Sequence, residues 1–226
     1  DVCSSDLDNT GKYTSLLWEP NEYINIMVYP FTDSQILGIS TFPYSLKNFF
    51  LEGTQQVSAS WITLENLSFP YCISINSSYI YEQSTDERIN QNDAAITLAH
   101  ELGHYLGLRH VFSEGGTTSM CTDTDYCKDT PSYNRSEYEQ WLNNLDKQNK
   151  YQLKDLAKRY SCEKGEYEAH NIMDYAYCFY NEITLEQRKR IRHILNYSPL
   201  IPGPKESRID TRGVQGRLNL PICIMK

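Results

Sequence analysis

The eleven residues HELGHYLGLRH, at positions 100–110, decide the architecture. Residues four apart share one face of an α-helix, so His100 and His104 can present two imidazole nitrogens to one cation. Gly107 is placed to end that helix, and a left-handed glycine there would turn the chain back and bring His110 up as a third ligand. Three protein nitrogens leave one position of a tetrahedral zinc ion open to water, as in catalytic zinc sites.

Glu101 lies about 100° around the same helix, beside these ligands. Zinc lowers the pKa of a bound water to about 7, and a nearby carboxylate can take the proton as the water attacks a carbonyl. The same carboxyl group can pass that proton to a leaving amine. The residues therefore predict amide hydrolysis with zinc as cofactor and Glu101 as base. The alternative, histidines and a glutamate placed on a helix by chance, is weakened by the glycine and the third histidine.

Charge and length limit the other possibilities. The chain has 226 residues, enough for one domain or two lobes that share a cleft. Its net charge of −8 argues against nucleic acid or an anionic bilayer as a partner. No segment is long and apolar enough to cross a membrane, so we expect a soluble monomer.

Seven cysteines favour an oxidising compartment, and we therefore expect disulfide bonds and a secreted, periplasmic or cell-surface location. The four from Cys121 to Cys178 could form two bridges in three connectivities, whereas free buried thiols are the alternative. Asp1 follows no basic and apolar leader, so a signal peptide or pro-segment is expected to have been removed or to be absent from this sequence.

Hydrophobic periodicity predicts an α+β chain. Alternation with a period of two predicts four strands in the N-terminal half, at residues 23–29, 36–42, 57–64 and 71–75. A helix is also possible within residues 45–51. Helical spacing predicts three further helices, the first from about Asn92 to Gly107, the second a charged helix over about residues 136–160, and the third opened by the capping box of Thr184 and Gln187.

A second motif adds a family resemblance. Residues 100–110 match the extended zinc signature of metzincin peptidases, and NIMDY at residues 171–175 resembles their Met-turn. The resemblance implies that Met173 lies beneath the metal and that Tyr175 stabilises the tetrahedral intermediate. A methionine in an apolar context is usually core filler, but the position of Met173 downstream of the zinc motif favours the Met-turn.

Within the metzincins the chain is most similar to the pappalysin family, over roughly residues 23–197. The matching features are Gly115-Gly116, Asp129-Thr130-Pro131, Asn171 to Tyr175, and LGISTFP at residues 37–43. The resemblance implies a bacterial secreted or envelope-attached endopeptidase, with release from a lipoprotein precursor as one route.

The family fold implied is a single catalytic domain over residues 1–226. Its upper lobe, to about residue 107, would hold a twisted mixed β-sheet and the active-site helix. Its lower lobe, residues 108–226, would be irregular apart from a C-terminal helix. A protein or peptide substrate would lie extended between the lobes and pair with an edge strand, for which residues 67–75 are our candidate.

Two features limit what the resemblance implies. The charged segment 136–160 separates His110 from Met173, and no acidic residue stands at 176–179, where related enzymes that prefer basic residues carry one.

A structural calcium ion is a second candidate cofactor, because Asp123, Asp125 and Asp129 offer hard oxygen ligands. A solvated acidic loop is the alternative.

Two other functions stay open. One is a binding or adhesion module that kept the fold and the metal without turnover, which the presence of Glu101 opposes. The other is a zinc hydrolase of non-peptide amides, which would need a closed pocket rather than an open cleft. For His170 we expect a packing or hydrogen-bonding role rather than metal binding.

Overall fold

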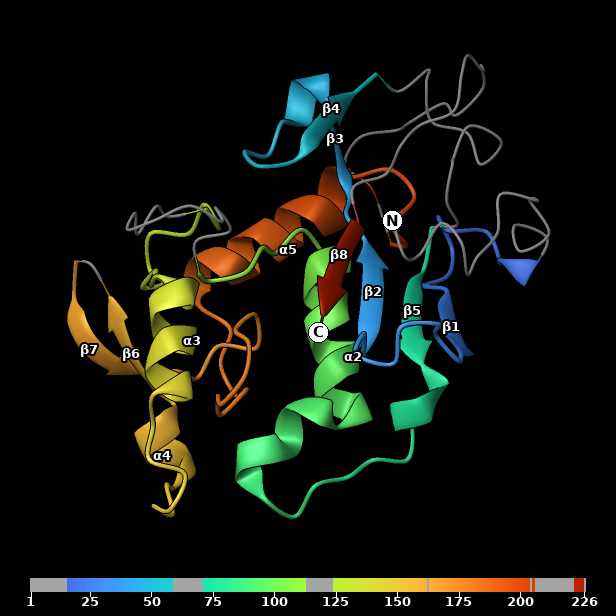
Figure 1. Ribbon diagram of the computed structural model, residues 1–226. Helices are drawn as coiled ribbons and strands as arrows, with labels where there is room; N and C mark the ends of the chain where they lie inside the picture. The colour runs from blue at the N-terminus through green and yellow to red at the C-terminus, as the bar shows by residue number, and fades with distance from the viewer. Residues whose placement is uncertain are drawn as a thin grey trace.

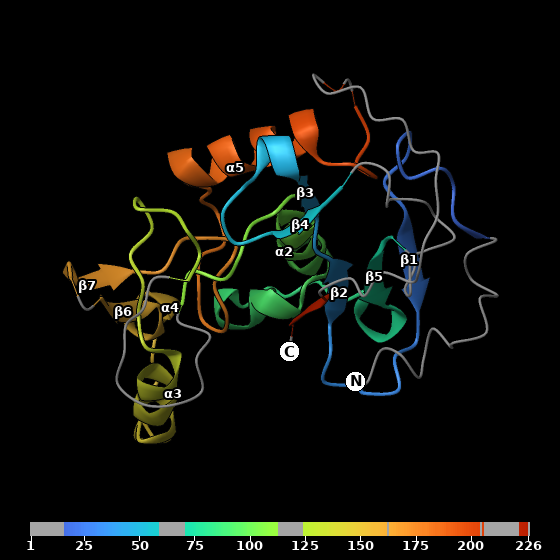
Figure 2. The same ribbon diagram turned by 90° about the horizontal axis from the view of Figure 1, so that it is seen from above.

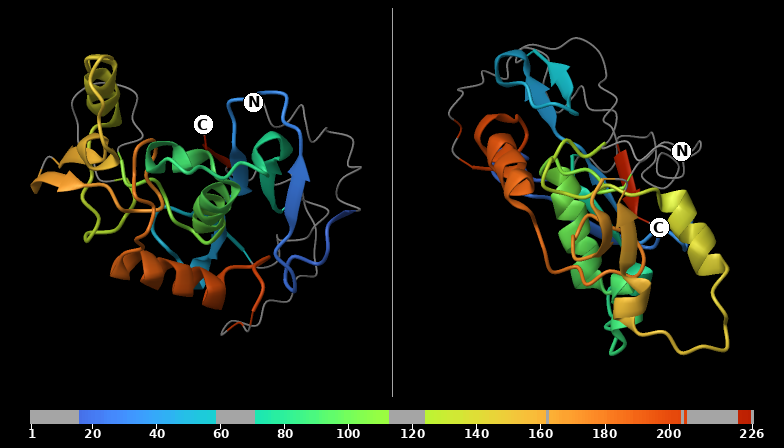
Figure 3. Two further views of the ribbon diagram at one scale, coloured as in Figure 1. Left: turned by 90° about the horizontal axis from the view of Figure 1, so that it is seen from below. Right: turned by 90° about the vertical axis from the view of Figure 1, so that its left-hand side faces the viewer.

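The structure is a computed structural model that describes residues 16–58, 71–112, 124–161, 163–203, 205 and 222–225 (Figure 1). Helix α2 (Ala94–Tyr105) stands at the centre, with a four-stranded sheet on one side. The views from above and below show α3 (Arg135–Asn143), α4 (Leu153–Leu156) and the ribbon of β6 (Lys158–Ser161) and β7 (Gly165–Glu168) on the other side (Figures 2 and 3). The predicted α+β class is confirmed, while the division into two lobes at residue 107 stays a prediction.

The sheet is mixed, in the order β1-β5-β2-β8. Its strands are β1 (Ile26–Tyr29), β5 (Ile73–Asn76), β2 (Gly38–Thr41) and β8 (Ile222–Met225). Strand β5 runs parallel to β1 and antiparallel to β2, and β8 runs antiparallel to β2. Three of the four predicted strands are therefore present here. A smaller parallel pair joins β3 (Tyr44–Leu46) to β4 (Gln55–Val57). Of the fourth predicted strand, residues 57–64, only Val57 belongs to β4, and residues 59–64 lie outside the described residues.

The predicted substrate edge is wrong. Residues 73–75 belong to β5, which lies between β1 and β2 and is paired on both sides, and residues 67–70 lie outside the described residues. Every residue of β5 and of β2 is buried. Neither strand therefore shows the alternation of buried and exposed side chains that would mark a strand with one solvent-exposed face. Strand β1 is different: Met27 and Tyr29 pack towards the core, while Ile26 and Val28 are almost half exposed.

Helix α2 confirms the helix predicted from about Asn92 to Gly107 and is two residues shorter at each end. It follows Asp93, which serves as N-cap residue without a capping hydrogen bond of its side chain. At the other end Gly107 has a φ of 87°, and the amide of Leu108 donates to the carbonyl of Gly103. This left-handed turn redirects the chain towards His110, as the sequence predicted.

The single charged helix expected within residues 136–160 is wrong. The segment contains all of α3 except its first residue, the short α4 and most of β6. Asp146 causes the break locally, since its side chain accepts a hydrogen bond from the amide of Gln148 and its carbonyl accepts one from Asn149. Such turns compete with helix continuation.

The last helix, α5 (Leu185–Tyr197), confirms the predicted capping box. The amide of Gln187 donates to Thr184 Oγ1, and the amide of Thr184 donates to Gln187 Oε1. Ile194 on its buried face reaches the turn at Gly107. The helix considered within residues 45–51 is one 3₁₀ turn, η2 (Lys47–Phe49); two more, η5 (Ser77–Tyr79) and η6 (Glu87–Asn92), precede α2.

The described thiols do not form the expected disulfide bonds. Cys72, Cys127 and Cys178 are free and buried. Burial raises the pKa of both the Cys72 and the Cys127 thiol to about 12. The thiol of Cys178 donates to the carbonyls of Ala169 and Asn171, and burial raises its pKa too. The side chains of the other four cysteines lie outside the described residues.

The turn at Gly107 gives a test of the fold. A Cβ at Gly107 would lie 2.7 Å from Ile194 Cγ1, whereas a Cβ at Gly165, with a φ of 78°, would meet nothing within 4 Å. We expect Gly107→Ala to lower the free energy of unfolding by about 2–4 kcal/mol, from backbone strain plus overpacking. Gly165→Ala should lower it by about 1–2 kcal/mol, from strain alone. Urea unfolding of both variants checks this, and equal losses would contradict it.

Candidate metal centre and active site

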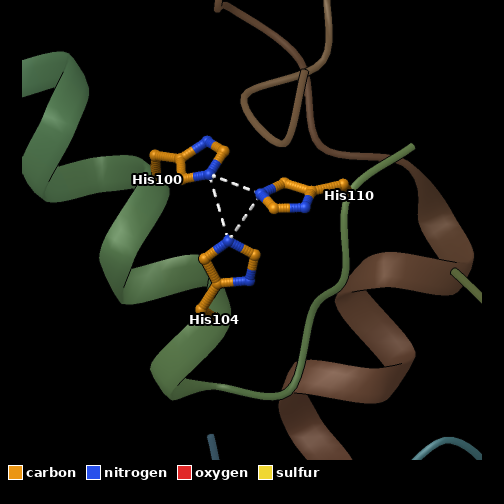
Figure 4. Close-up of side chains that lie close together, drawn as sticks. All are labelled: His100, His104 and His110. Carbon is orange, nitrogen blue, oxygen red and sulfur yellow. Dashed lines mark hydrogen bonds between the residues drawn. The ribbon is translucent and has the colours of Figure 1, made fainter. Parts of the chain in front are cut away.

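Three imidazole rings converge at one point (Figure 4). His100 and His104 stand one turn apart on α2, and His110 faces them from the segment that follows the Gly107 turn. Their Nε2 atoms lie 3.0 Å apart between His100 and His104, 3.0 Å between His104 and His110, and 3.3 Å between His100 and His110. All three side chains are buried. The structure therefore brings together the three residues predicted to bind metal.

Backbone carbonyls set the orientation of two of these rings. Nδ1 of His100 lies 2.7 Å from the carbonyl oxygen of Ile172, and Nδ1 of His104 lies 2.8 Å from that of Leu108. A carbonyl accepts only, so each Nδ1 carries the proton and each Nε2 of the neutral ring presents its lone pair inwards. The lone pairs of His100 and His104 face each other at 3.0 Å, an arrangement that a cation between them stabilises.

The nitrogen geometry fits zinc. Nitrogens bound to a tetrahedral zinc ion at about 2.0–2.1 Å lie roughly 3.3 Å apart. The three histidines are also the one group of potential metal ligands found among the described residues. Burial lowers the pKa of His100 to about 4, against the opposing effect of its hydrogen bond to Ile172. Burial, and then the neighbouring histidines, hold the pKa of His104 and His110 well below its usual range, so the neutral rings that a metal needs are favoured.

Glu101 is fully buried beside this cluster. Neither of its carboxylate oxygens has a hydrogen-bond partner among the described residues. Burial raises the pKa of this carboxyl group well above its usual range. An unpaired buried carboxylate is costly in a folded protein. A water molecule bound to a zinc ion held by the three histidines would supply the missing hydrogen-bond partner.

The Met-turn lies against α2, and its predicted position beneath a metal ion stays a prediction. Met173 is fully buried, and a Cβ on Gly103 would lie only 2.3 Å from its Sδ. The next residue of the helix is His104, and the residue before Met173 supplies the carbonyl that orients His100. The Met-turn therefore supports the histidine cluster through both packing and hydrogen bonding.

Tyr175 lies beside the histidine cluster. Its ring centroid is 4.4 Å from that of His110 and 5.4 Å from that of His100. The side chain is almost fully buried, and the guanidinium of Arg135 lies over its ring at 4.7 Å. The sequence motifs thus identified two separate segments that the fold brings into contact.

Comparison with known proteins agrees with this geometry. The family model Peptidase_M43, described as "Pregnancy-associated plasma protein-A", matches residues 52–196. The chain belongs to this pappalysin family. The family predicted from the zinc signature and the Met-turn is confirmed.

Two relatives extend the comparison. This pappalysin is 30% identical over 191 residues to an extracellular metalloprotease of Arthroderma otae, covering 83% of this chain and 56% of that protein. It is 37% identical over 108 residues to an extracellular metalloprotease of Arthroderma benhamiae, covering 46% of this chain and 32% of that protein. It therefore spans about half, or less, of the length of these relatives. Among solved structures it is similar to mature mirolysin of Tannerella forsythia in complex with a cleaved peptide, with a TM-score of 0.44, 22% identity, and coverage of 78% of this chain and 53% of that chain.

The buried cation Arg159 supports the Met-turn, and the sequence did not reveal it. Its Nη2 donates to the carbonyls of Tyr175 and Tyr177, and its Nε lies 3.4 Å from Asp174 Oδ2. Burial opposes the charge on Arg159, but Asp174 and the tyrosines around it outweigh this effect and raise its pKa. Asp174 also accepts hydrogen bonds from Tyr133 Oη at 2.5 Å and from the amide of Tyr175 at 2.7 Å.

The expected calcium site gains no support. The carboxylate of Asp125 accepts hydrogen bonds from the amide of Cys127 and from Thr130 Oγ1. Asp129 accepts one from the amide of Glu186 at the start of α5. Both aspartates therefore stabilise local structure, and Asp123 lies outside the described residues.

His170 has the non-metal role that we expected. Its Nδ1 lies 3.0 Å from Asn181 Oδ1, and its ring stacks on Phe179. No helix within the described residues of this pappalysin has the length and apolar character needed to cross a membrane.

The Arg159 contacts give a second test. We expect Arg159→Met to lower the free energy of unfolding by about 3–5 kcal/mol, because it leaves the buried charge of Asp174 uncompensated. The matched control is Arg192→Met on the exposed side of α5, which should change stability by about 0.5 kcal/mol or less. Urea unfolding measures both, and similar small effects would show that the buried pair adds little.

Proposed function

We propose that the chain is a zinc endopeptidase that hydrolyses peptide bonds in extended substrates. His100, His104 and His110 hold the zinc, and Glu101 is the general base. The observation that carries this proposal is the convergence of three inward-facing Nε2 atoms beside a buried carboxylate that has no hydrogen-bond partner in the described part of the chain. Family membership supports the same reaction class.

The chemistry follows from the placement of these groups. Zinc bound here would supply an acidified water and a Lewis acid for the substrate carbonyl. Glu101 takes the proton of the attacking water and delivers it to the leaving amine. Tyr175, next to His110, donates a hydrogen bond to the carbonyl oxygen as negative charge develops on it.

An extended protein or peptide substrate agrees with the sheet edge beside the metal. Strand β8 runs antiparallel along β2, next to α2, so this edge can hold a chain in extended conformation. Pairing between backbones makes such an edge tolerant of sequence. A single catalytic domain acting as a monomer stays part of the proposal.

Secretion is also part of the proposal. It is supported by the relatives, which are named extracellular metalloproteases. The free thiols of Cys72, Cys127 and Cys178 remove the disulfide argument for the described part of the chain. Release from a lipoprotein precursor stays a prediction.

Substitution of the base separates catalysis from metal binding. We expect Glu101→Gln to lower kcat by at least about 10³-fold while zinc content stays at one per chain, because general base catalysis is lost and the three ligands remain. His104→Ala should lose both zinc and activity. Cleavage of a quenched peptide and metal analysis of the purified variants measure this, and substantial turnover by Glu101→Gln would refute the mechanism.

Removal of the Tyr175 hydroxyl tests its proposed role in the transition state. We expect Tyr175→Phe to lower kcat by about 10²-fold with little change in KM, the usual effect of losing one oxyanion donor. Tyr177→Phe, two residues further along the same segment, is the matched control and should retain activity. An unchanged kcat in Tyr175→Phe would restrict the tyrosine to packing against His110.

A further inference from the structure

The edge of the sheet nearest to the base is the outer edge of β2. Gly38, the first residue of β2, lies so close to α2 that an added Cβ would be 2.8 Å from Glu101 Cγ and 2.9 Å from Thr97 Cγ2. Strand β2 therefore rests directly on the helix that carries the base. A peptide that pairs with its outer edge is placed beside the metal centre.

That edge is occupied by a segment of the same chain. Met225 lies opposite Gly38, Ile224 opposite Ile39, Cys223 opposite Ser40 and Ile222 opposite Thr41. Figure 1 shows β8 alongside β2 and in front of α2, and β8 is in contact with both. The direction of β8 carries its chain towards Gly38, and hence towards Glu101.

An antiparallel ladder offers each backbone group of β2 to one partner strand only. The bonds are made by the main chain, so a substrate peptide in extended conformation would use the same groups of β2 as β8 does. A substrate peptide and β8 therefore cannot pair with the outer edge of β2 at the same time. Because β8 belongs to the same chain as β2, its pairing is intramolecular and does not depend on the concentration of the protein.

We propose that Ile222–Met225 is an intramolecular competitor of the substrate, which must leave the outer edge of β2 before an extended peptide can pair there. This inference rests on the proposed peptidase function for its kinetic consequence. The effect on affinity depends on the fraction of molecules in which the outer edge of β2 is free. The apparent dissociation constant of the peptide equals its intrinsic dissociation constant divided by that fraction. If one molecule in about ten has a free edge, release of β8 tightens peptide binding about tenfold.

Proline substitution breaks the ladder, since proline has no amide proton. Successive amides of a strand point to opposite sides, so the double variant Cys223→Pro/Ile224→Pro removes a donor from β8 whichever residue faces β2. Its control is Cys223→Ala/Ile224→Val, which changes the same side chains and keeps both amides. A variant that ends at Lys205 removes the segment and serves where the proline variant does not fold.

The expected result is a KM for a quenched extended peptide about tenfold lower in the proline variant, with kcat unchanged and the control like the parent chain. A synthetic peptide with the sequence of residues 219–226 should inhibit the variant that ends at Lys205 competitively. An unchanged KM, with a lower melting temperature, would make β8 a permanent structural strand and overturn the inference.

Peptide binding without turnover separates this inference from the proposed function. In the Glu101→Gln background, fluorescence anisotropy of a labelled peptide should show about tenfold tighter binding when the proline pair is present. If the parent chain has no peptidase activity but this shift occurs, the proposed function fails and the competition stands. Equal affinities with and without the proline pair overturn the competition whatever the activity.

Discussion

Close packing around α2 is the constraint on which the rest of the structure depends. Three glycines mark its contacts: an added Cβ would meet Glu101 at Gly38, Met173 at Gly103 and Ile194 at Gly107. The first contact joins the helix to the sheet, the second to the Met-turn, and the third to α5. Because protein interiors are packed as densely as crystals, a helix held on three sides cannot rotate or slide without cost. His100 and His104 are therefore held in fixed positions by the packing of their helix.

The metal centre could be predicted from sequence because its information is local. His100, Glu101 and His104 are related by the helical repeat, and His110 by a single glycine turn. The capping box of α5 is local in the same way. These features need no knowledge of distant residues, which explains why their predicted positions agree with the structure.

The incorrect predictions concern relations between distant segments. The sequence does not distinguish β5 from an edge strand, because a fully buried interior strand and a short edge strand look alike in an apolar run. Strand β5 is interior because it pairs with β1 and with β2, two segments that lie more than 30 residues before it along the chain. The buried position of Arg159 is not visible in the sequence for a related reason: a strand with alternating burial places it inwards, whereas the sequence predicts one charged helix over this segment.

Arg159 shows how a buried charge can serve a metal centre that it does not touch. Ala176 has a φ of 55°, a left-handed conformation that is costly for a residue with a Cβ. The carbonyls on either side of it, those of Tyr175 and Tyr177, both accept hydrogen bonds from Arg159 Nη2. The guanidinium therefore holds this turn in place and, through it, the ring of Tyr175 against His110. Asp174 balances the charge, and it also fixes the amide of Tyr175. Since a planar fork can reach both carbonyls and the carboxylate at once, lysine could not replace arginine here.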